Sequence, residues 1–237
     1  MPAHSSSETP SPAPDFDVLI IGAGLSGLYQ LYRVRELGLR ARVIEAGSDV
    51  GGTWYWNRYP GARFDSESYT YGYSFSPELL QEWNWSEHFA PQPETLRYVG
   101  YVADKFDLRR DMTFNSRVRA AVWNEAARAW TVTLEDGSSA TARFLVTAVG
   151  PLSAPVMPRI AGVGDFKGEA HHTARWPKTP VSFEGKRVAV IGTGATALQL
   201  VPILAERAAH LEVYQRTPIW VMPKFDTAIP PWIRTTF

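Results

Sequence analysis

The 237-residue sequence contains no cysteine. A chain without thiols forms no disulfide, carries no thiol nucleophile or thiolate metal ligand, and cannot perform dithiol redox chemistry. The sequence therefore excludes enzymes with a cysteine nucleophile, metal sites with thiolate ligands, dithiol oxidoreductases and small disulfide-rich folds. We predict no metal site.

The sequence also lacks an excess of either charge and lacks long apolar runs. Lys plus Arg and Asp plus Glu number 24 each, so no net field draws the chain to nucleic acid or to an anionic membrane. No stretch approaches the ~20 apolar residues of a membrane span, and the N-terminus has no basic region followed by an apolar one. With 45% hydrophobic residues, we expect a soluble, cytoplasmic, globular protein.

The first 15 residues are rich in Ser and Pro, and we expect them to form a disordered tail. A β-α-β pattern follows. Phe16–Ile21 is a short apolar run typical of a strand in a parallel sheet. Leu25–Leu37 has apolar residues at helical spacing, and Ala41–Glu45 resembles a second strand.

The loop between that strand and helix has the form G-x-G-x-x-G, from Gly22 through Ser26 to Gly27. Gly22 permits the tight turn, Gly24 lets the backbone approach a pyrophosphate, and Gly27 lets helix and strand pack closely. Glu45 ends the second strand, where a carboxylate accepts hydrogen bonds from ribose hydroxyls. The pattern predicts a dinucleotide site; the alternative is a glycine turn without a ligand.

A second β-α-β pattern begins at Arg187–Ile191, with a helix to about Arg207 and a strand over Leu211–Gln215. Its candidate cofactor-binding residues form the loop and the first helical turn. They are Gly192, Thr193, Gly194, Ala195, Thr196, Ala197, Leu198 and Gln199.

The two patterns can be overlaid, because Gly22 and Glu45 have the same separation as Gly192 and Gln215. A neutral residue thus replaces the acid, and Arg216 and Thr217 follow it. An arginine suits a ribose 2′-phosphate, which a carboxylate would repel. The first motif therefore favours FAD and the second NADPH, unless Arg216 is an ordinary surface arginine.

Between the motifs, residues 113–149 alternate in polarity and predict a small antiparallel meander, and residues 94–106 predict a helix. The expected fold class is α/β, with two Rossmann-like dinucleotide-binding units, FAD then NADPH, and a small antiparallel β-meander, C-terminally truncated. The expected domains are an FAD-binding domain at 16–150, a linker at 151–185 and the start of an NADPH-binding domain at 186–237.

The linker contains F-x-G-x-x-x-H-x-x-x-W-P from Phe166 to Pro177, with His172 in the histidine position. This spacing resembles the fingerprint of the type I Baeyer–Villiger monooxygenases. The alternative is a connector in which Phe166 and Trp176 pack on a surface and His172 caps a turn.

The resemblance extends through nearly the whole chain after the tail and implies further site residues. Segment 51–67 is expected to be irregular, and the resemblance implies that one group of its residues contacts the flavin and another faces the nicotinamide. Outside this segment the resemblance implies one more flavin contact and one adenine contact. The flavin group is Thr53, Trp54, Tyr55 and Trp56; the nicotinamide group is Tyr59, Arg63, Phe64 and Asp65; the added contacts are Tyr71 and Val118.

The resemblance also implies a reaction. NADPH would reduce FAD, reduced flavin would form a C4a-peroxide with O2, and the peroxide would attack a small ketone to give an ester or lactone. Asp65 matches an active-site aspartate that is paired with an arginine, and His172 is the second candidate catalytic residue. Family members continue beyond the position of Phe237, and no arginine here matches that partner.

Three alternatives follow from these observations. The chain is the N-terminal portion of such a monooxygenase; or it is a truncated, non-catalytic nucleotide-binding protein that binds FAD weakly or serves as one half of a split enzyme completed by a C-terminal fragment; or it is a related amine- or sulfide-oxidising flavin monooxygenase. Trp176-Pro177 favours the ketone enzymes. The absence of cysteine excludes the flavin disulfide reductases, which share a two-nucleotide architecture.

Overall fold

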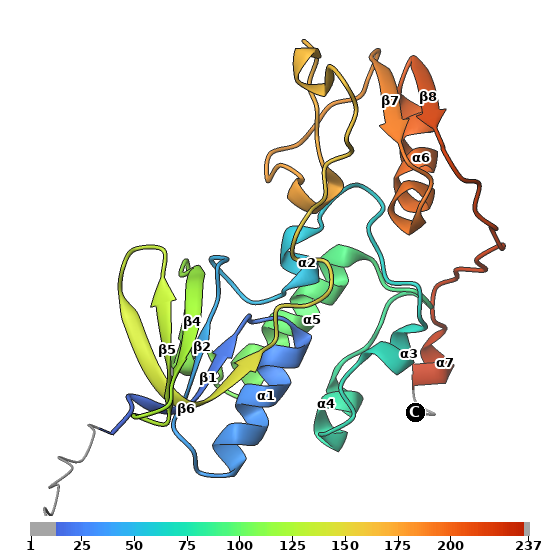
Figure 1. The fold of residues 1–237 in the computed structure, drawn as a ribbon. Helices are drawn as coiled ribbons and strands as arrows, with labels where there is room; N and C mark the ends of the chain where they lie inside the picture. The colour runs from blue at the N-terminus through green and yellow to red at the C-terminus, as the bar shows by residue number, and fades with distance from the viewer. Residues whose placement is uncertain (1–12, 235–237) are drawn as a thin grey trace, which may run out of the picture. The chain divides into compact units, whose positions relative to one another are not determined.

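A computed structural model describes residues 13–234 of the chain (Figure 1). Two compact units emerge: the described part of Met1–Gly52 with Ala103–Gly150, and Thr53–Val102 with the described part of Pro151–Phe237. Residues 53–102, which the sequence assigns to the FAD-binding domain, group with the second unit. Most of the expected tail lies outside the described residues. Its last residue, Asp15, is hydrogen-bonded to strand β6, since its Oδ2 accepts the Thr141 backbone N–H at 2.8 Å.

The first unit is built on one six-stranded mixed sheet in the order β3-β2-β1-β6-β5-β4. Parallel pairing joins β1 to both β2 and β6, and antiparallel pairing joins β5 to β6 and to β4. Its strands are β1 (Phe16–Ile21), β2 (Ala41–Ile44), β3 (Met112–Thr113), β4 (Val118–Asn124), β5 (Ala129–Leu134) and β6 (Ser139–Thr147). The expected meander is therefore confirmed, and its last strand is also part of the parallel sheet.

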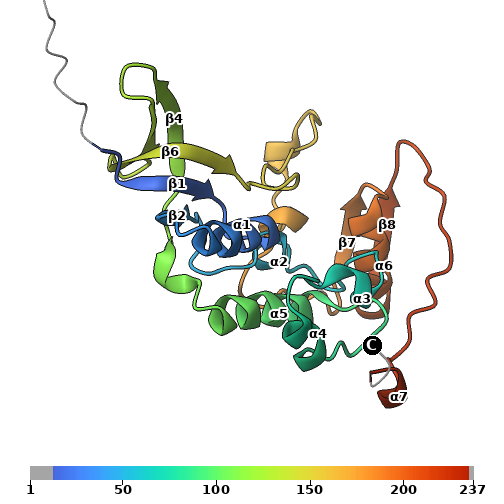
Figure 2. The same cartoon turned by 90° about the horizontal axis from the view of Figure 1, so that it is seen from below.

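Helix α1 (Leu25–Glu36) packs on β1 and β2 (Figure 2). Its apolar residues Leu28 and Leu31 are fully buried, as are Leu19 and Ile20 of β1. The predicted first β-α-β motif is thus confirmed, with boundaries within one residue. The 3-10 turn η1 (Arg109–Asp111) precedes β3.

The second unit combines a helical part with the second β-α-β motif. Its elements are α2 (Thr53–Trp56), α3 (Ser68–Tyr71), α4 (Pro77–Glu82), α5 (Gln92–Lys105, which ends in the first unit), η2 (Val163–Asp165), η3 (Thr173–Arg175), β7 (Arg187–Ile191), α6 (Ala195–Arg207), β8 (His210–Tyr214) and α7 (Pro231–Arg234). β7 and β8 pair in parallel. The core under α6 contains Tyr59, Ala62, Phe183, Leu200 and Leu204.

Local sequence explains the elements that periodicity missed. Segment 51–67, expected to be irregular, contains the single turn α2. Helix α4 begins at Pro77, where the fixed φ of proline suits the first helical position, and the Ser76 hydroxyl accepts the Leu79 N–H at 3.2 Å. Within residues 13–234, no helix has the length and apolar character to cross a membrane.

Candidate cofactor sites

The first glycine loop, in the first unit, has no room for a side chain at Gly22 or Gly27 and little room at Gly24. Gly22 has φ +104°, and a Cβ there would lie 2.6 Å from the Ala148 carbonyl oxygen. A Cβ on Gly27 would lie 1.9 Å from the Gly22 carbonyl oxygen. At Gly24 a Cβ would meet the Cα of Gly52 at 3.3 Å. The three glycines thus give the tight turn and close packing that a pyrophosphate-binding loop needs.

Helix α1 begins at this loop and presents a suitable surface for a phosphate. Gly24 is its N-cap, and its first turn contains no acidic side chain. The Ser26 side chain, also in this turn, lies on the exposed side of the helix. The free N–H groups and the dipole of a helix start favour a negative charge. The residues present therefore fit a dinucleotide pyrophosphate.

Glu45 lies directly after β2 and is only 5% exposed. Its Oε2 accepts the Ala23 N–H at 2.7 Å, and its Oε1 accepts the Gly47 N–H at 2.6 Å. An ionised carboxylate offers about four acceptor positions, so two N–H donors leave capacity for ribose hydroxyls. The Glu45 carbonyl also accepts the Ser116 N–H at 2.9 Å, which ties the segment just before β4 to the end of β2; the predicted adenine contact Val118 is the first residue of β4.

Glu45→Gln is expected to lower FAD retention about tenfold, which corresponds to ~1.4 kcal/mol. The amide keeps the size of the side chain but turns an NH2 donor toward one of the two backbone N–H groups and weakens the acceptor for the ribose. Flavin content per protein after gel filtration measures the loss. Glu36→Gln, at an exposed ion pair with Arg33, is the control. Equal flavin content in both variants would contradict the role of Glu45.

Two of the predicted flavin-side aromatics, Trp54 and Tyr71, cluster in the second unit with Phe64, which the resemblance implies on the nicotinamide side. The Trp54 Nε1–H donates to the Tyr71 hydroxyl at 2.8 Å, and the Phe64 and Tyr71 rings stack with centroids 4.2 Å apart. Trp54 also meets Phe64 edge to face at 5.8 Å. Burial raises the pKa of Tyr71, outweighing the Trp54 hydrogen bond, so its hydroxyl stays protonated. Thr53 begins α2, and Trp56 packs on Tyr55 with centroids 4.9 Å apart.

Gln199 of α6 ties the predicted nicotinamide group to the second motif. Its Oε1 accepts the Tyr59 hydroxyl at 2.8 Å and the Arg63 N–H at 3.2 Å. Its Nε2 donates to the Arg63 carbonyl at 2.9 Å and to Asp65 Oδ1 at 3.2 Å. The loop approaches this closely because of Gly61, which has φ +81° and where a Cβ would lie 2.4 Å from the Gln199 carbonyl. The structure therefore brings three predicted residues together around one amide.

The second glycine loop, also in the second unit, is more open than the first. Gly192 has φ +110°, yet a Cβ there or at Gly194 would meet nothing within 4 Å. Gly194 is the N-cap of α6, and Ala197, in the third glycine position, is buried against the helix core. Arg216 and Thr217 follow β8 with exposed side chains. The loop and the first turn of α6 also contain the other predicted contacts, Thr193, Ala195, Thr196 and Leu198.

The fingerprint residues lie in the connector around η3. His172 is the N-cap of this turn, and its Nδ1 accepts the Ala174 N–H at 3.1 Å. Trp176 packs against the core under α6, and the ring of Phe166 is 65% exposed. A Cβ on Gly168 would lie 2.5 Å from that ring, which explains the glycine. The cap by His172 and the packing of Trp176 match the connector alternative, whereas the exposed Phe166 ring does not, and the catalytic role of His172 stays a prediction.

Several residues at these sites escaped sequence reasoning. Gly52 packs on the first loop, Gln92 donates to the Trp54 carbonyl, and Lys178 donates to the Tyr55 hydroxyl at 3.0 Å. Lys224 contacts Asp65 Oδ1 at 3.3 Å. The only sequence signals were the paired glycines at 51–52 and the position of Lys178 after Trp176-Pro177.

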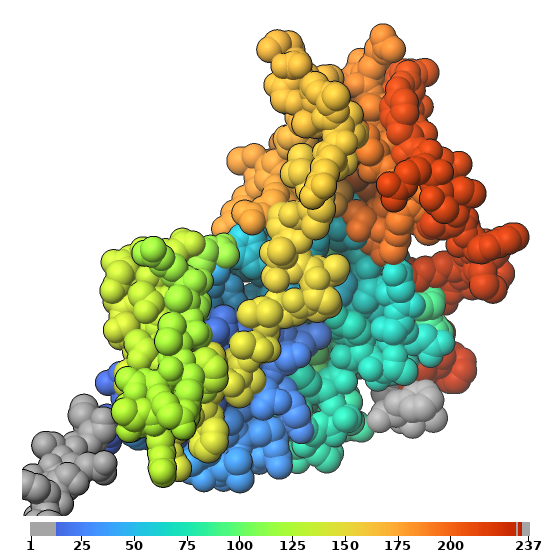
Figure 3. Space-filling model, in the orientation of Figure 1, coloured from blue at the N-terminus to red at the C-terminus, as the bar shows by residue number. Residues whose placement is uncertain are grey.

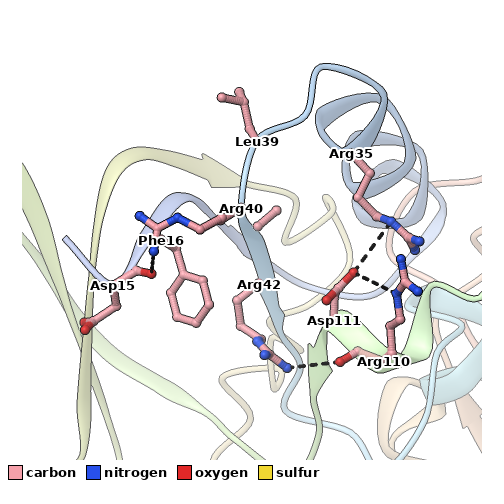
Figure 4. A pocket seen from close by; sticks show the side chains of 9 residues that line it. Asp15, Phe16, Arg35, Leu39, Arg40, Arg42, Arg110 and Asp111 are labelled. Atoms are coloured by element: carbon pink, nitrogen blue, oxygen red, sulfur yellow. Dashed lines mark hydrogen bonds and ion pairs between the residues drawn. The ribbon is translucent and has the colours of Figure 1, made fainter. Parts of the chain in front are cut away.

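A cleft of about 440 Å³ in the first unit is lined by Asp15, Phe16, Arg35, Leu39, Arg40, Ala41, Arg42, Arg110 and Asp111 (Figure 4). It lies where β1 and β2 begin, whereas ligands of parallel sheets bind beyond the carboxyl ends of the strands. Its arginines already donate to nearby groups: Arg40 to the Asp15 carbonyl at 2.8 Å and Arg42 to the Arg110 carbonyl at 3.3 Å. We do not assign a cofactor to this cleft.

Comparison with known proteins gives a consistent result. The model of the flavin-binding monooxygenase-like family matches residues 16–233. The chain is 52% identical over 217 residues to 2-oxo-Delta(3)-4,5,5-trimethylcyclopentenylacetyl-CoA monooxygenase of Pseudomonas putida, covering 89% of this chain and 40% of that protein. It is 46% identical to acetone monooxygenase (methyl acetate-forming) of Gordonia sp., covering 93% of this chain and 42% of that protein.

A third relative is named as an N-monooxygenase. It is phenazine N-monooxygenase PhzNO1 of Lysobacter antibioticus, which is 45% identical, covering 87% of this chain and 38% of that protein. Among solved structures, OTEMO in complex with FAD and NADP matches with a TM-score of 0.91 and 50% identity, covering 95% of this chain and 43% of that one. The chain therefore spans about 40% of the length of the relatives that it matches.

Proposed function

This chain belongs to the flavin-binding monooxygenase-like family, and we propose that it is part of an FAD- and NADPH-dependent monooxygenase that converts a small ketone to an ester or lactone. In balanced form, ketone, O2, NADPH and a proton give ester, water and NADP+. The observation that carries the proposal is the pair of β-α-β motifs, one with a carboxylate after its second strand and one with a guanidinium there.

The first unit would hold the pyrophosphate and the ribose of FAD. Gly22, Gly24 and Gly27 open the space for the pyrophosphate, and the start of α1 offers free N–H groups to it. Glu45 would accept the ribose hydroxyls while it fixes the loop through the Ala23 and Gly47 N–H groups. When bound, FAD supplies the oxygen-activating chemistry, and the protein supplies binding, orientation and electrostatics.

The second unit would hold NADPH at the open loop Gly192–Ala197. Gln215 stands in the position where the first motif has its acid, and Arg216, the next residue, is an exposed cation that suits a 2′-phosphate. Tyr59, Arg63 and Asp65 are fixed to α6 through Gln199, so their positions follow the second motif. This coupling supports a place for them on the nicotinamide side.

Arg216→Ala is expected to raise the Michaelis constant for NADPH 10- to 100-fold while that for NADH changes little. The loss corresponds to about 1.5–3 kcal/mol for a charge-assisted hydrogen bond, and NADH lacks the phosphate that makes it. Steady-state kinetics with both cofactors in the full-length protein measure the effect. Arg207→Ala, an exposed arginine at the end of α6, is the control. A parallel change for both cofactors would argue against a phosphate contact.

Ketone oxidation is favoured over oxidation at nitrogen by the fingerprint, which ends in Trp176-Pro177. The test is aerobic NADPH consumption with small cyclic and linear ketones, with amines and sulfides as competing substrates, and mass detection of products. Ester or lactone formed in proportion to NADPH supports the proposal. N-oxide or S-oxide without ester would favour the amine- or sulfide-oxidising alternative.

The length of the relatives bears on the assay. Because the chain spans about 40% of their length, we propose that residues 1–237 alone bind nucleotides without coupled ester formation, and that a complementing C-terminal polypeptide restores it. The test measures nucleotide binding and ester formation for residues 1–237 and for a protein extended at the C-terminus. Nucleotide binding by residues 1–237, without any ester from the longer protein, would favour the non-catalytic alternative.

A further inference from the structure

Residues 224–229, here called the clasp segment, form an antiparallel pairing inside the second unit. The segment lies between β8 and α7 (Figure 1) and belongs to the red part of the space-filling view (Figure 3). The His88 N–H donates to the Thr227 carbonyl at 2.9 Å, and the Ile229 N–H donates to the Ser86 carbonyl at 3.0 Å. Ile229 is buried, with 5% exposure. The clasp segment is therefore docked by backbone hydrogen bonds and an apolar side chain.

Lys224, the first residue of the clasp segment, is fixed by three contacts. Its Nζ donates to the Phe64 carbonyl at 2.9 Å and lies 3.3 Å from Asp65 Oδ1. It also lies 4.2 Å from the centroid of the Phe89 ring, a cation–π contact. Its side chain is 31% exposed, whereas most lysine ammonium groups lie free in solvent. The ammonium is therefore directed at Asp65.

Asp65 receives a second donor on the same oxygen. Gln199 Nε2 donates to Oδ1 at 3.2 Å, so among the described residues both hydrogen-bond donors of this carboxylate reach Oδ1. The Asp65 side chain is 66% exposed. One oxygen is therefore fixed from two sides, and Oδ2 keeps its acceptor capacity for another group.

We propose that Lys224 is a positioning residue that holds the Asp65 carboxylate in the orientation needed for oxidation of the ketone. The inference rests on the proposed function, in which Asp65 belongs to the active site. Without the ammonium, an exposed carboxylate samples several rotamers, and each misplacement of a charged group weakens its effect on the reacting atoms. Gln199 alone would then hold Oδ1 by a single neutral donor.

Other contacts separate this role from plain stability. Arg63 pairs with Asp226 of the clasp segment and with Glu87 at 3.2 Å, independently of Lys224. The backbone pairing also remains when the side chain of Lys224 changes. Lys224→Met should therefore leave the clasp segment docked and remove only the charge beside Asp65.

The experiment compares Lys224→Met and Lys224→Arg in the full-length protein, with Lys186→Met as the control for loss of a surface ion pair with Glu169. Lys224→Met should lower kcat and the ester formed per NADPH about 10- to 100-fold, with KM for NADPH within about threefold. Lys224→Arg should recover most of the rate. Parental kcat in Lys224→Met, or an equal fall in both variants, would overturn the proposal.

A second measurement does not depend on activity. Trypsin cleaves after lysine, so the rate of cleavage at Lys224–Phe225, followed by mass spectrometry, reports whether the ammonium is engaged. We expect faster cleavage in Asp65→Asn than in the parent protein. If cleavage is equally fast in both, the pairing is wrong whatever the protein oxidises. If cleavage differs but the parent makes no ester, the proposed function fails while the contact stands.

Discussion

Gly27→Ala is expected to abolish FAD retention and to lower the free energy of unfolding by roughly 1–3 kcal/mol. The new Cβ would lie 1.9 Å from the Gly22 carbonyl oxygen and 3.7 Å from the Ala148 Cβ. The contact at 1.9 Å is with backbone, which cannot rotate away as a side chain does. Helix α1 and the end of β1 must therefore separate, and the start of the helix then moves away from the pyrophosphate.

Flavin absorbance per protein and thermal unfolding of the apoprotein measure the two effects. Gly164→Ala is the matched control, because a Cβ there meets nothing within 4 Å and its backbone has no left-handed conformation. Normal flavin content in Gly27→Ala would show that the loop geometry does not decide FAD binding. A loss of flavin with unchanged stability would instead locate the effect in the ligand contact.

Asp65→Ala is expected to lower kcat for ketone oxidation about 10²–10³-fold, as removal of one preorganised electrostatic group does. Among the described residues, the Asp65 carboxylate is the ion-pair partner of the Lys224 ammonium, which lies 3.3 Å from Oδ1. Removal of the Asp65 carboxylate leaves the Lys224 ammonium without this counter-charge, and it removes the hydrogen bond from Gln199 Nε2 to Oδ1. In the proposed function, this aspartate lies on the nicotinamide side of the active site.

Rapid kinetics and NADP+ titration separate the effects of this substitution. We expect NADP+ affinity to change less than about threefold, because Tyr59 and Arg63 keep their bonds to Gln199. Glu206→Ala, an exposed acid on α6, is the control for loss of a carboxylate in the same unit. A kcat within tenfold of that of the parent protein would contradict the proposed role of Asp65 in the active site.

The sequence predicted the elements whose determinants are local. An apolar run, a glycine loop and an amphipathic segment follow one another in both motifs, and β1, β7 and α6 have the expected bounds. In the first loop, Gly27 is explained by the Gly22 carbonyl only five residues away, whereas the partners of Gly22 and Gly24 are Ala148 and Gly52. Such patterns are visible because the steric requirement falls on a single residue type.

The contacts that fix the candidate site could not be predicted in the same way. Gln199 binds Tyr59, Arg63 and Asp65 across more than 130 positions, and Lys224 reaches Asp65 across 159. No periodicity or spacing signals a pairing over such a separation. Lysine at 224 follows a proline in an exposed segment, where composition predicts only a solvated charge.

The fingerprint illustrates the difference between a motif and its physical basis. The sequence identifies F-x-G and the histidine, but not that Gly168 makes room for the Phe166 ring or that His172 Nδ1 accepts the Ala174 N–H. Trp176 packs into the core under α6. These contacts explain why the residues are needed for the shape of the connector, and a chemical role for His172 remains a prediction.

The most direct test of the account is oxidation of a ketone by the full-length protein, loaded with FAD and supplied with NADPH, under an atmosphere of ¹⁸O2. The proposed function predicts an ester or lactone that carries one ¹⁸O atom, with one NADPH consumed for each product molecule. An unlabelled product, or NADPH oxidation with no oxygenated ketone product, would contradict the central claim.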